Sequence, residues 1–325
     1  MKDIVLRRPV ISVTTILCCS LLFGCGGGGG TTSGTTPPNP TPVVTLTPTP
    51  VTPSAPIVSY DVAFDFDRDR TFRSVGASLS VARSKATGLL QIEAAIQPND
   101  AAILIDYASA SQRISVRYEG EQSTVLGAPS VRQSNQIGWT QGLTASTRGE
   151  VVAFAREPSY QYVLSSVFSS TTDEAPPGSF EEKRRLMLAG AATIASDIPA
   201  TGVALFTPIL TTFAQGPDRP RSYITSSGAL FRVDFAARTF TATIPYSENG
   251  YPSSVVPEMG TLIFTGTLNN LTNELSGAIT SADSTWSGPF TGRLFGPAGI
   301  EAGILFTIYR ASDGARGVGE LLGRR

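Results

Sequence analysis

Short runs rich in valine, isoleucine, threonine and phenylalanine recur along the chain from Ile57 onward, separated by clusters of glycine, serine, asparagine and aspartate. Side chains of a strand point alternately to its two faces, and runs of this composition between turn-forming clusters are typical of strands. No apolar pattern with the helical period persists over this part of the sequence. The pattern therefore predicts an all-β protein.

The most regular part is the segment 199–325, which we predict to be an eight-stranded antiparallel up-and-down β-barrel. Closing a sheet into a barrel removes both of its edges and leaves an interior that side chains can fill. In the last long strand, Ile304, Phe306 and Ile308 share one face and are predicted to lie in the core. The expected strands are 202–213, 228–235, 238–245, 260–268, 274–280, 288–295, 301–310 and 315–322.

The segment 57–198 is less regular and predicts a β-rich, handle-like domain before the barrel. Ser179–Glu182 has the form of a capping box, which favours a helix over 183–196, yet Gly190 interrupts that run. Helix and strand both stay open there. The strands expected elsewhere in this domain are 58–66, 78–83, 89–94, 102–107, 113–118, 151–156 and 160–168.

A membrane-inserted barrel is the competing interpretation of such strands. It would need a sustained lipid-facing row of apolar residues flanked by aromatic girdles, and the predicted strands do not show one. The sequence also ends in Gly323-Arg324-Arg325 rather than in an aromatic residue. A water-soluble barrel is the simpler prediction.

The amino-terminal residues predict export and lipidation. Lys2, Arg7 and Arg8 precede a short apolar run, as in a secretory signal peptide, which we assign to residues 1–24. Leu22-Phe23-Gly24-Cys25 resembles the bacterial lipobox, in which the chain is cut before a cysteine that becomes lipidated, although Phe23 stands where a small residue is usual. Each buried acyl methylene adds about 0.8 kcal/mol, so two or three chains on Cys25 would anchor the protein permanently.

Residues 25–56 form the predicted tether. Five consecutive glycines follow Cys25, and prolines then recur every few residues, so this segment cannot bury enough apolar surface to fold. In the polyproline II conformation, at ~3.1 Å per residue, it would reach about 90 Å. Gly26 follows the cysteine in place of the aspartate that retains related lipoproteins at the inner membrane, which favours the outer membrane.

Composition excludes several kinds of chemistry. The chain contains no histidine, which removes histidine-based catalytic triads and histidine metal ligands. Its three cysteines, Cys18, Cys19 and Cys25, all lie in the first 25 residues, so the rest of the chain holds no disulfide or thiolate metal site. The net charge of −1, with scattered cations, predicts no nucleic-acid binding. We expect no cofactor and no bound metal.

Four segments of the second half resemble, in order, the motifs of one family: PATGVALF, GALFRVDF, the strand–corner–strand from Gly288 to Phe306, and GVGELLGRR. The family is the transferrin-binding-protein-like surface lipoproteins of Gram-negative bacteria, and the likeness is to the barrel of the C-terminal lobe of transferrin-binding protein B. The first half matches more loosely, through Ile105-Asp106-Tyr107 and the RISVRY strand. The resemblance implies a handle-like domain before a barrel, a binding role, and a strand over 186–194. The long charged insertions of the transferrin receptors are absent, so it does not imply transferrin as the ligand.

Glu301 follows a Gly-Pro-Ala-Gly corner, and the question is whether this carboxylate serves catalysis or the fold. Glycines permit backbone angles that other residues avoid, and Pro297 fixes one angle. We therefore interpret Gly296, Pro297, Glu301 and Gly303 as structural and predict no catalytic residue. A catalytic carboxylate would need a second acid nearby, which the sequence does not reveal.

Three further candidates are weaker. Asp65, Asp67 and Asp69 alternate as calcium ligands could, but the arginines between them oppose a cation, so we predict an exposed face or turn instead. Trp139 and Trp286 are candidate contacts for a partner if they are exposed, and Trp286 is favoured because we place it in a loop.

These observations predict an outer-membrane lipoprotein, monomeric, surface-exposed or periplasm-facing, that binds a partner without catalysis. The partner is a host protein, an iron or haem carrier, or another solute. Two alternatives remain open: a carboxylate-dependent hydrolase or lyase of envelope glycans, and a structural envelope lipoprotein.

Overall fold

The structure is a computed structural model of the chain. It describes residues 59–83, 90–97, 103–118, 123–140, 147–155, 159–174, 179–217, 222–226, 229–250, 258–283 and 285–325. The predicted signal peptide, Cys25 and the tether lie outside the described residues. Pro56–Arg325 forms one compact unit. A search of the described residues for a helix long and apolar enough to cross a membrane finds none.

The first sheet is organised around β1 (Arg70–Arg83), which is long enough to pair with three strands. Its beginning pairs with β3 (Ile103–Ala108), and the rest lies between β2 (Leu90–Gln97) and β10 (Ser179–Gly190). The strand order is β5-β4-β3-β1-β10-β9-β8-β7-β6, with β2 beside β1. The other bounds are β4 Arg113–Tyr118, β5 Thr124–Leu126, β6 Val131–Gln133, β7 Gln136–Thr140, β8 Thr147–Ala155 and β9 Val163–Glu174.

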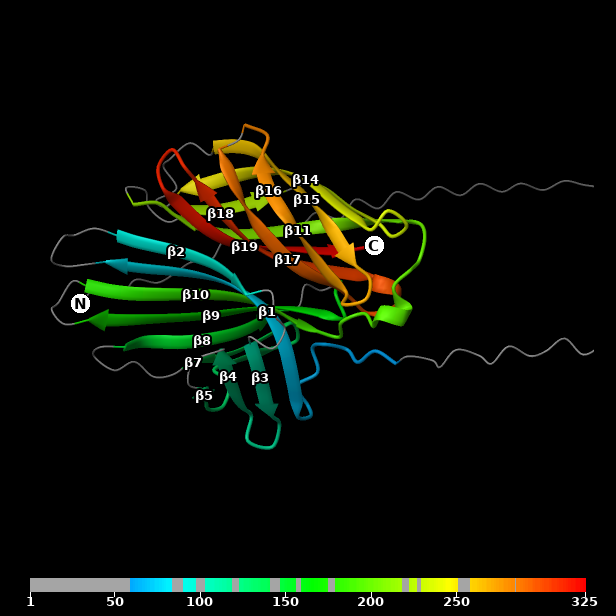
Figure 1. Cartoon of the computed structure of the whole chain (residues 1–325). Coiled ribbons are helices and arrows are strands. Elements are labelled where there is room, and N and C mark those ends of the chain that lie inside the picture. Colours follow the sequence, from blue (N-terminus) through cyan, green and yellow to red (C-terminus); the bar gives the residue numbers. More distant parts are fainter. Residues whose placement is uncertain are drawn as a thin grey trace, which may run out of the picture. The chain divides into compact units, whose positions relative to one another are not determined.

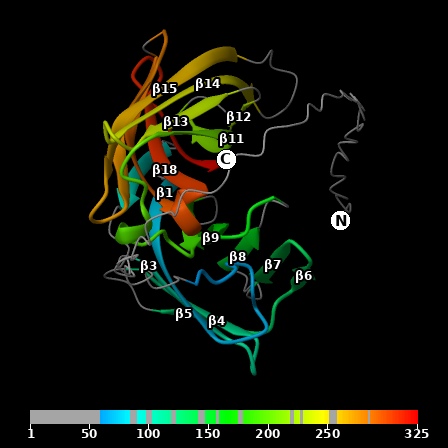
Figure 2. The same cartoon turned by 90° about the vertical axis from the view of Figure 1, so that its right-hand side faces the viewer.

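This sheet curls, so its two flanks enclose a core of their own. Trp139 on β7 packs against Tyr107 on β3, with 5.9 Å between ring centroids, and Phe66 contacts both rings. Figure 2 shows the curvature. The buried cluster inside it is Ala63, Phe66, Phe72, Ile103, Ile105, Tyr107, Ile114, Val116, Tyr118, Leu126, Ile137, Trp139, Leu164, Phe168, Met187 and Ala189.

The predicted strand at 58–66 is wrong, because the first strand begins only at Arg70. Ala63 and Phe66 are buried, but they belong to an irregular segment. The backbone N–H of Asp67 donates to the Asp65 carboxylate at 3.3 Å, a local turn that competes with strand pairing.

The open question over 183–196 is settled for most of its length, since β10 is a strand up to Gly190. Met187 and Ala189 face the core of the first sheet, whereas Leu186 and Leu188 face the barrel. A strand buried on both faces reads as a continuous apolar run rather than as an alternation, which is why it resembled a helix.

The second half forms an eight-stranded antiparallel barrel, as the sequence predicted (Figure 1). β12 (Ser222–Ser226) and β13 (Leu230–Asp234) share one position between β11 (Val203–Gln215) and β14 (Thr239–Gly250). β11 also pairs with β19, which closes the barrel. The other strands are β15 Glu258–Asn269, β16 Glu274–Ser281, β17 Trp286–Phe295, β18 Glu301–Arg310 and β19 Ala315–Arg324. Two short 3-10 turns precede β11 and β18, η1 at Ala195–Asp197 and η2 at Pro297–Gly299.

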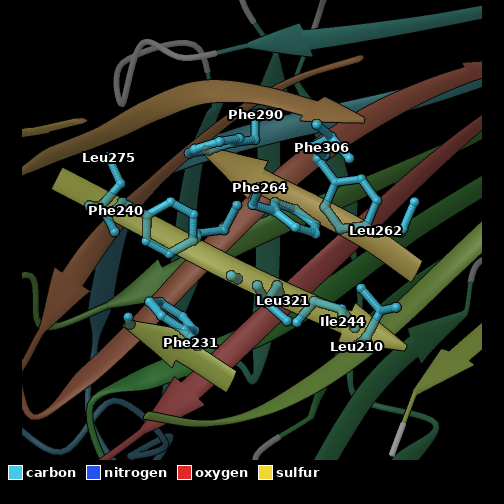
Figure 3. Packing of buried hydrophobic residues seen from close by; sticks show 14 of the residues in the cluster. Leu210, Phe231, Phe240, Ile244, Leu262, Phe264, Leu275, Phe290, Phe306 and Leu321 are labelled. Atoms are coloured by element: carbon cyan, nitrogen blue, oxygen red, sulfur yellow. The ribbon is translucent and has the colours of Figure 1, made fainter. Parts of the chain in front are cut away.

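Aromatic rings fill the interior of the barrel (Figure 3). Phe264 and Phe306 meet edge to face at 5.3 Å, and Phe240 and Phe290 do so at 5.2 Å. Ile304, Phe306 and Ile308 lie in this core, which confirms the predicted face of β18. Glycines on neighbouring strands leave room for the rings: a Cβ on Gly266 would meet the ring of Phe290.

The outer wall of β18 and β19 packs against the first sheet. Leu305 and Val318 from the barrel and Leu186 and Leu188 from β10 belong to one buried apolar cluster. The two sheets therefore share a dry contact, which makes the described part of the unit a continuous packed body.

Replacing Gly266 by alanine should destabilise the barrel by about 1–3 kcal/mol, the usual result of overpacking a filled core. The new Cβ would collide with the backbone oxygen of Ser276 as well as with Phe290. Gly127→Ala is the matched control, because a Cβ there would have open space around it. Denaturant unfolding of both variants checks this, and equal midpoints would contradict the packing described here.

Candidate binding groove and the joint that positions it

Glu301 joins the barrel to the first sheet. Its side chain is 1% exposed at the start of β18, and its carboxylate accepts three backbone hydrogen bonds from the start of β9. The N–H of Gln161 donates at 2.7 Å, that of Tyr162 at 2.8 Å and that of Val163 at 2.9 Å. Hydrogen bonds to an ionised acceptor are roughly twice as strong as neutral ones. Glu301 is therefore occupied as a hydrogen-bond acceptor that joins the start of β18 to residues 161–163.

The corner before Glu301 has the backbone that its glycines predicted. Gly296 has φ 71° and Gly299 has φ 66°, angles that favour glycine. The ring of Tyr162 occupies the place that a Cβ on Gly296 would need, and Pro297 begins η2. Gly303 lies against Leu188 of the first sheet. All these positions therefore lie at the contact between barrel and sheet.

Both tryptophans are placed in cores rather than on the surface. Trp286 is fully buried as the first residue of β17, with the Arg310 guanidinium 4.4 Å from its ring, so it lies in a barrel strand and not in the expected loop. Trp139 is also fully buried, and its Nε1 donates to the backbone oxygen of Gln112 at 3.0 Å.

The three alternating aspartates point to different partners. Asp65 bonds to Arg68 at 2.8 Å, and Asp67 bonds to Arg132 at 2.9 Å. Asp69 accepts from the backbone N–H and the hydroxyl of Ser109, both at 2.7 Å. Across the described ranges, no three carboxylates or cysteines gather as metal ligands would. These side chains act as hydrogen-bond acceptors and ion-pair partners.

A groove of about 360 Å³ lies on the outer face of the first sheet, across β1, β3, β4 and β5. The floor is strand backbone, and the walls are side chains that point away from the core. The lining residues are Asp69, Arg70, Thr71, Asp106, Tyr107, Ala108, Arg113, Ile114, Ser115 and Val125.

The two carboxylates of this groove have hydrogen-bond partners within the protein, whereas one of its arginines has none among the described residues. Asp106 accepts from the Thr71 hydroxyl at 2.8 Å. The hydroxyl and the backbone N–H of Ser109 hold the pKa of the Asp69 carboxyl below its ordinary value. Arg113 is exposed and makes no hydrogen bond or ion pair within the part of the chain that the structure describes. The groove thus offers a free cation and an exposed Val125 beside two engaged carboxylates.

Sequence reasoning missed the groove, although it predicted β3 and β4 closely. Asp106, Arg113 and Ser115 alternate with buried residues, so they were identifiable as outward-facing. What the pattern did not contain is the way β1, β3, β4 and β5 combine, because the pairing of β1 with β3 joins segments that are separated in sequence.

A buried ion pair lies inside one end of the barrel. Arg310 on β18 and Glu248 on β14 are each 6% exposed, and their charged atoms are 3.0 Å apart. Asp313 accepts two more hydrogen bonds from the same guanidinium. The ring of Trp286 lies beneath Arg310. These partners satisfy the charges internally, so they contribute to the filling of the barrel.

Neither a family model nor a curated protein matches this sequence. Among solved structures, it is similar to a double mutant of transferrin binding protein B from Haemophilus parasuis Hp5, with 8% identity, a TM-score of 0.40, and 79% of this chain and 76% of that chain covered. For isotype 1 of the same protein from serogroup B Neisseria meningitidis, the identity is 9%, the TM-score 0.35 and the coverage 80% and 77%. A protein of unknown function from Nostoc punctiforme reaches 9% identity and a TM-score of 0.20, covering 78% of this chain and 95% of that one. Likenesses of this size concern the fold and say nothing about what this chain binds.

Glu301→Ala should destabilise the unit by about 3 kcal/mol or more, because each buried N–H left without an acceptor costs roughly 1–3 kcal/mol. Glu301→Gln should be intermediate, since an amide keeps one of the two acceptor oxygens. Glu93→Ala on β2 is the control, an exposed carboxylate outside the joint. Denaturant unfolding ranks the three variants by their free energy of unfolding. A Glu301→Ala variant as stable as the control would contradict the role of Glu301 in joining the barrel to the first sheet.

The Asp69 contact should make stability depend on acidity. Its pKa is lowered in the folded state, so its contribution is full above the ordinary value of 3.8 and is lost as the pH falls through the lower folded pKa. The free energy of unfolding of Asp69→Asn should therefore approach that of the wild type as the solution becomes more acidic than about pH 4. If the difference in the free energy of unfolding between the wild type and Asp69→Asn is the same at about pH 6 and about pH 2, the bond to Ser109 is contradicted.

Proposed function

We propose that this chain is a non-enzymatic binding protein, anchored by lipid at Cys25 to the outer membrane, and that it contacts its partner through the groove of the first sheet. The observation that carries the proposal is the contrast between the two halves. The barrel interior is filled by phenylalanine rings and by an internally paired arginine, whereas the groove is open, is lined in part by charged side chains and carries a free cation.

The contents of the groove support binding rather than catalysis. The hydroxyls of Ser109 and Thr71 engage its two carboxylates, so neither Asp69 nor Asp106 is presented to transfer a proton. A rigid β scaffold with an open groove and exposed charged side chains suits recognition of a larger surface. The partner class is a host protein, an iron or haem carrier, or another solute with an acidic group to meet Arg113. Direct haem ligation by histidine is impossible in a chain without histidine.

The envelope glycan hydrolase is the second candidate. It would require two carboxylates about 5–9 Å apart across a cleft, and Asp69 and Asp106 both line the groove. Enzymatic turnover of envelope glycans that disappears in both Asp69→Asn and Asp106→Asn would favour this candidate over the binding protein.

The anchor is tested by replacing Cys25 with serine. The wild-type chain should incorporate labelled palmitate and sediment with membranes, and Cys25→Ser should do neither, because one missing attachment site removes every acyl chain. A Cys25→Ser chain that stays in the membrane fraction would contradict lipid anchoring.

The binding surface is tested with Asp106→Arg in the groove and Glu93→Arg outside it, both exposed acids in the first sheet. Full-length protein on cells is exposed to labelled host serum and periplasmic extract, and the retained proteins are compared. The proposal predicts that a partner captured by the wild type and by Glu93→Arg is lost from Asp106→Arg, because the groove then carries repelling cations. Identical capture by all three chains would show that the groove is not the contact.

A further inference from the structure

One end of the barrel carries a continuous rim, which we call the tether-side rim. It consists of the segments 194–202, 235–238, 269–273 and 296–300, together with Arg324 and Arg325. Hydrogen bonds connect these turns around the end: Phe235 donates to Gly202, Leu268 to Arg238, Asn273 to Thr193 and Leu294, and Arg325 to Ile300. The rim is thus a single connected surface.

The chain that follows the tether is fixed at this rim. The Tyr60 hydroxyl donates to Asp197 at 2.8 Å and accepts from the backbone N–H of Ile194 at 3.2 Å. Asp197 also accepts from the N–H of Ala298 at 2.8 Å. In Figure 1, the blue start of the described chain and the C-terminus lie at the same end. A chain anchored through Cys25 is therefore held by this end.

Apolar side chains are exposed on the same rim. Leu271 at the tip of the β15–β16 turn is 80% exposed, and Ile194 is 41% exposed. At the start of β11, Val203 and Leu205 are 50% and 60% exposed. The Asn269 carboxamide accepts from the backbone N–H groups of Leu271 and Thr272, which fixes the tip. Exposed apolar side chains grouped on one end mark an interaction surface more often than singly scattered ones do.

The charges of the rim favour an anionic partner. Arg238 is exposed in the β13–β14 turn and has no side-chain partner among the residues described. Arg325 is exposed after β19, and its guanidinium donates to the backbone oxygen of Ala298 at 2.6 Å. The rim carboxylates are mostly engaged, Asp197 by Tyr60 and Asp234 by Arg232 at 2.9 Å. Glu274 lies opposite Arg293 in the strand register.

We propose that the tether-side rim docks on a lipid bilayer, with Leu271 and Ile194 entering the boundary between headgroups and acyl chains and Arg238 and Arg325 meeting anionic headgroups. The inference builds on the proposed anchor at Cys25. The predicted tether would keep the rim at an effective concentration of about 1 mM near the bilayer, so weak insertion would be enough to orient the domain. The docked state fixes which way the groove faces relative to the membrane.

The test places a tryptophan at either end of β15 in the full lipoprotein. Leu271→Trp reports from the rim, and Met259→Trp, at a residue 75% exposed near the other end of the strand, is the matched control. The native Trp139 and Trp286 are buried and give the same background in both. Ile194→Trp is a second rim reporter. The chains are anchored in vesicles of phosphatidylethanolamine and phosphatidylglycerol with brominated acyl chains.

The proposal predicts that bromine quenches the emission of the tryptophan in Leu271→Trp. The extent of quenching in Met259→Trp should be the same as in the wild type. Unquenched rim reporters on chains that float with the vesicles overturn it. The proposal is also overturned if the emission of the rim reporters is not quenched but shifts to the blue as the protein concentration rises. In that case a second copy of the chain covers the rim.

The soluble Cys25→Ser chain separates failure of the anchor from failure of the rim. With vesicles in excess, Leu271→Trp in this chain should still be quenched, and adding Arg238→Glu should weaken vesicle binding by about fivefold or more. A lipoprotein that does not float with the vesicles, while Leu271→Trp in the Cys25→Ser chain is quenched at excess vesicles, refutes the anchor alone. If the emission of Leu271→Trp in the Cys25→Ser chain is not quenched, docking of the rim on the bilayer is refuted.

Discussion

Three backbone N–H groups converge on one buried carboxylate, and the arrangement of the two halves depends on that contact. Without Glu301, the start of β9 would leave three donors facing an apolar contact, a cost that few interactions could offset. The ring of Tyr162 then fits over Gly296, and Leu188 fits over Gly303. One acceptor thus fixes the angle at which the first sheet lies on the barrel.

The barrel was predictable because each of its strands has one face inside and one outside. The bounds of β18 matched the expected ones, and the interior set Ile304, Phe306 and Ile308 was identified correctly. The first sheet was harder, because β10 is buried on both faces and the segment before Arg70 alternates without pairing. Glu301 was recognised as structural, but its partners at 161–163 are distant in sequence, so no local pattern could name them.

The two surfaces that carry the functional proposals also depend on contacts between residues that are distant in sequence. Side chains of the groove and of the tether-side rim are ordinary for exposed strands and turns when each is read alone. Arg113 becomes informative only because the pairing of β1, β3 and β4 places it in one groove with Asp106 and Asp69. Leu271 becomes informative only because the hydrogen bond from Tyr60 holds the start of the described chain at the same end of the barrel.

Amide hydrogen exchange at Gln161, Tyr162 and Val163 tests the central claim most directly. If the Glu301 carboxylate holds these N–H groups in a rigid joint, they exchange only when the whole unit unfolds, as strongly protected core amides do. Exchange of these three amides at the rate of exposed loops, while the barrel strands stay protected, would show that the two halves are not joined there.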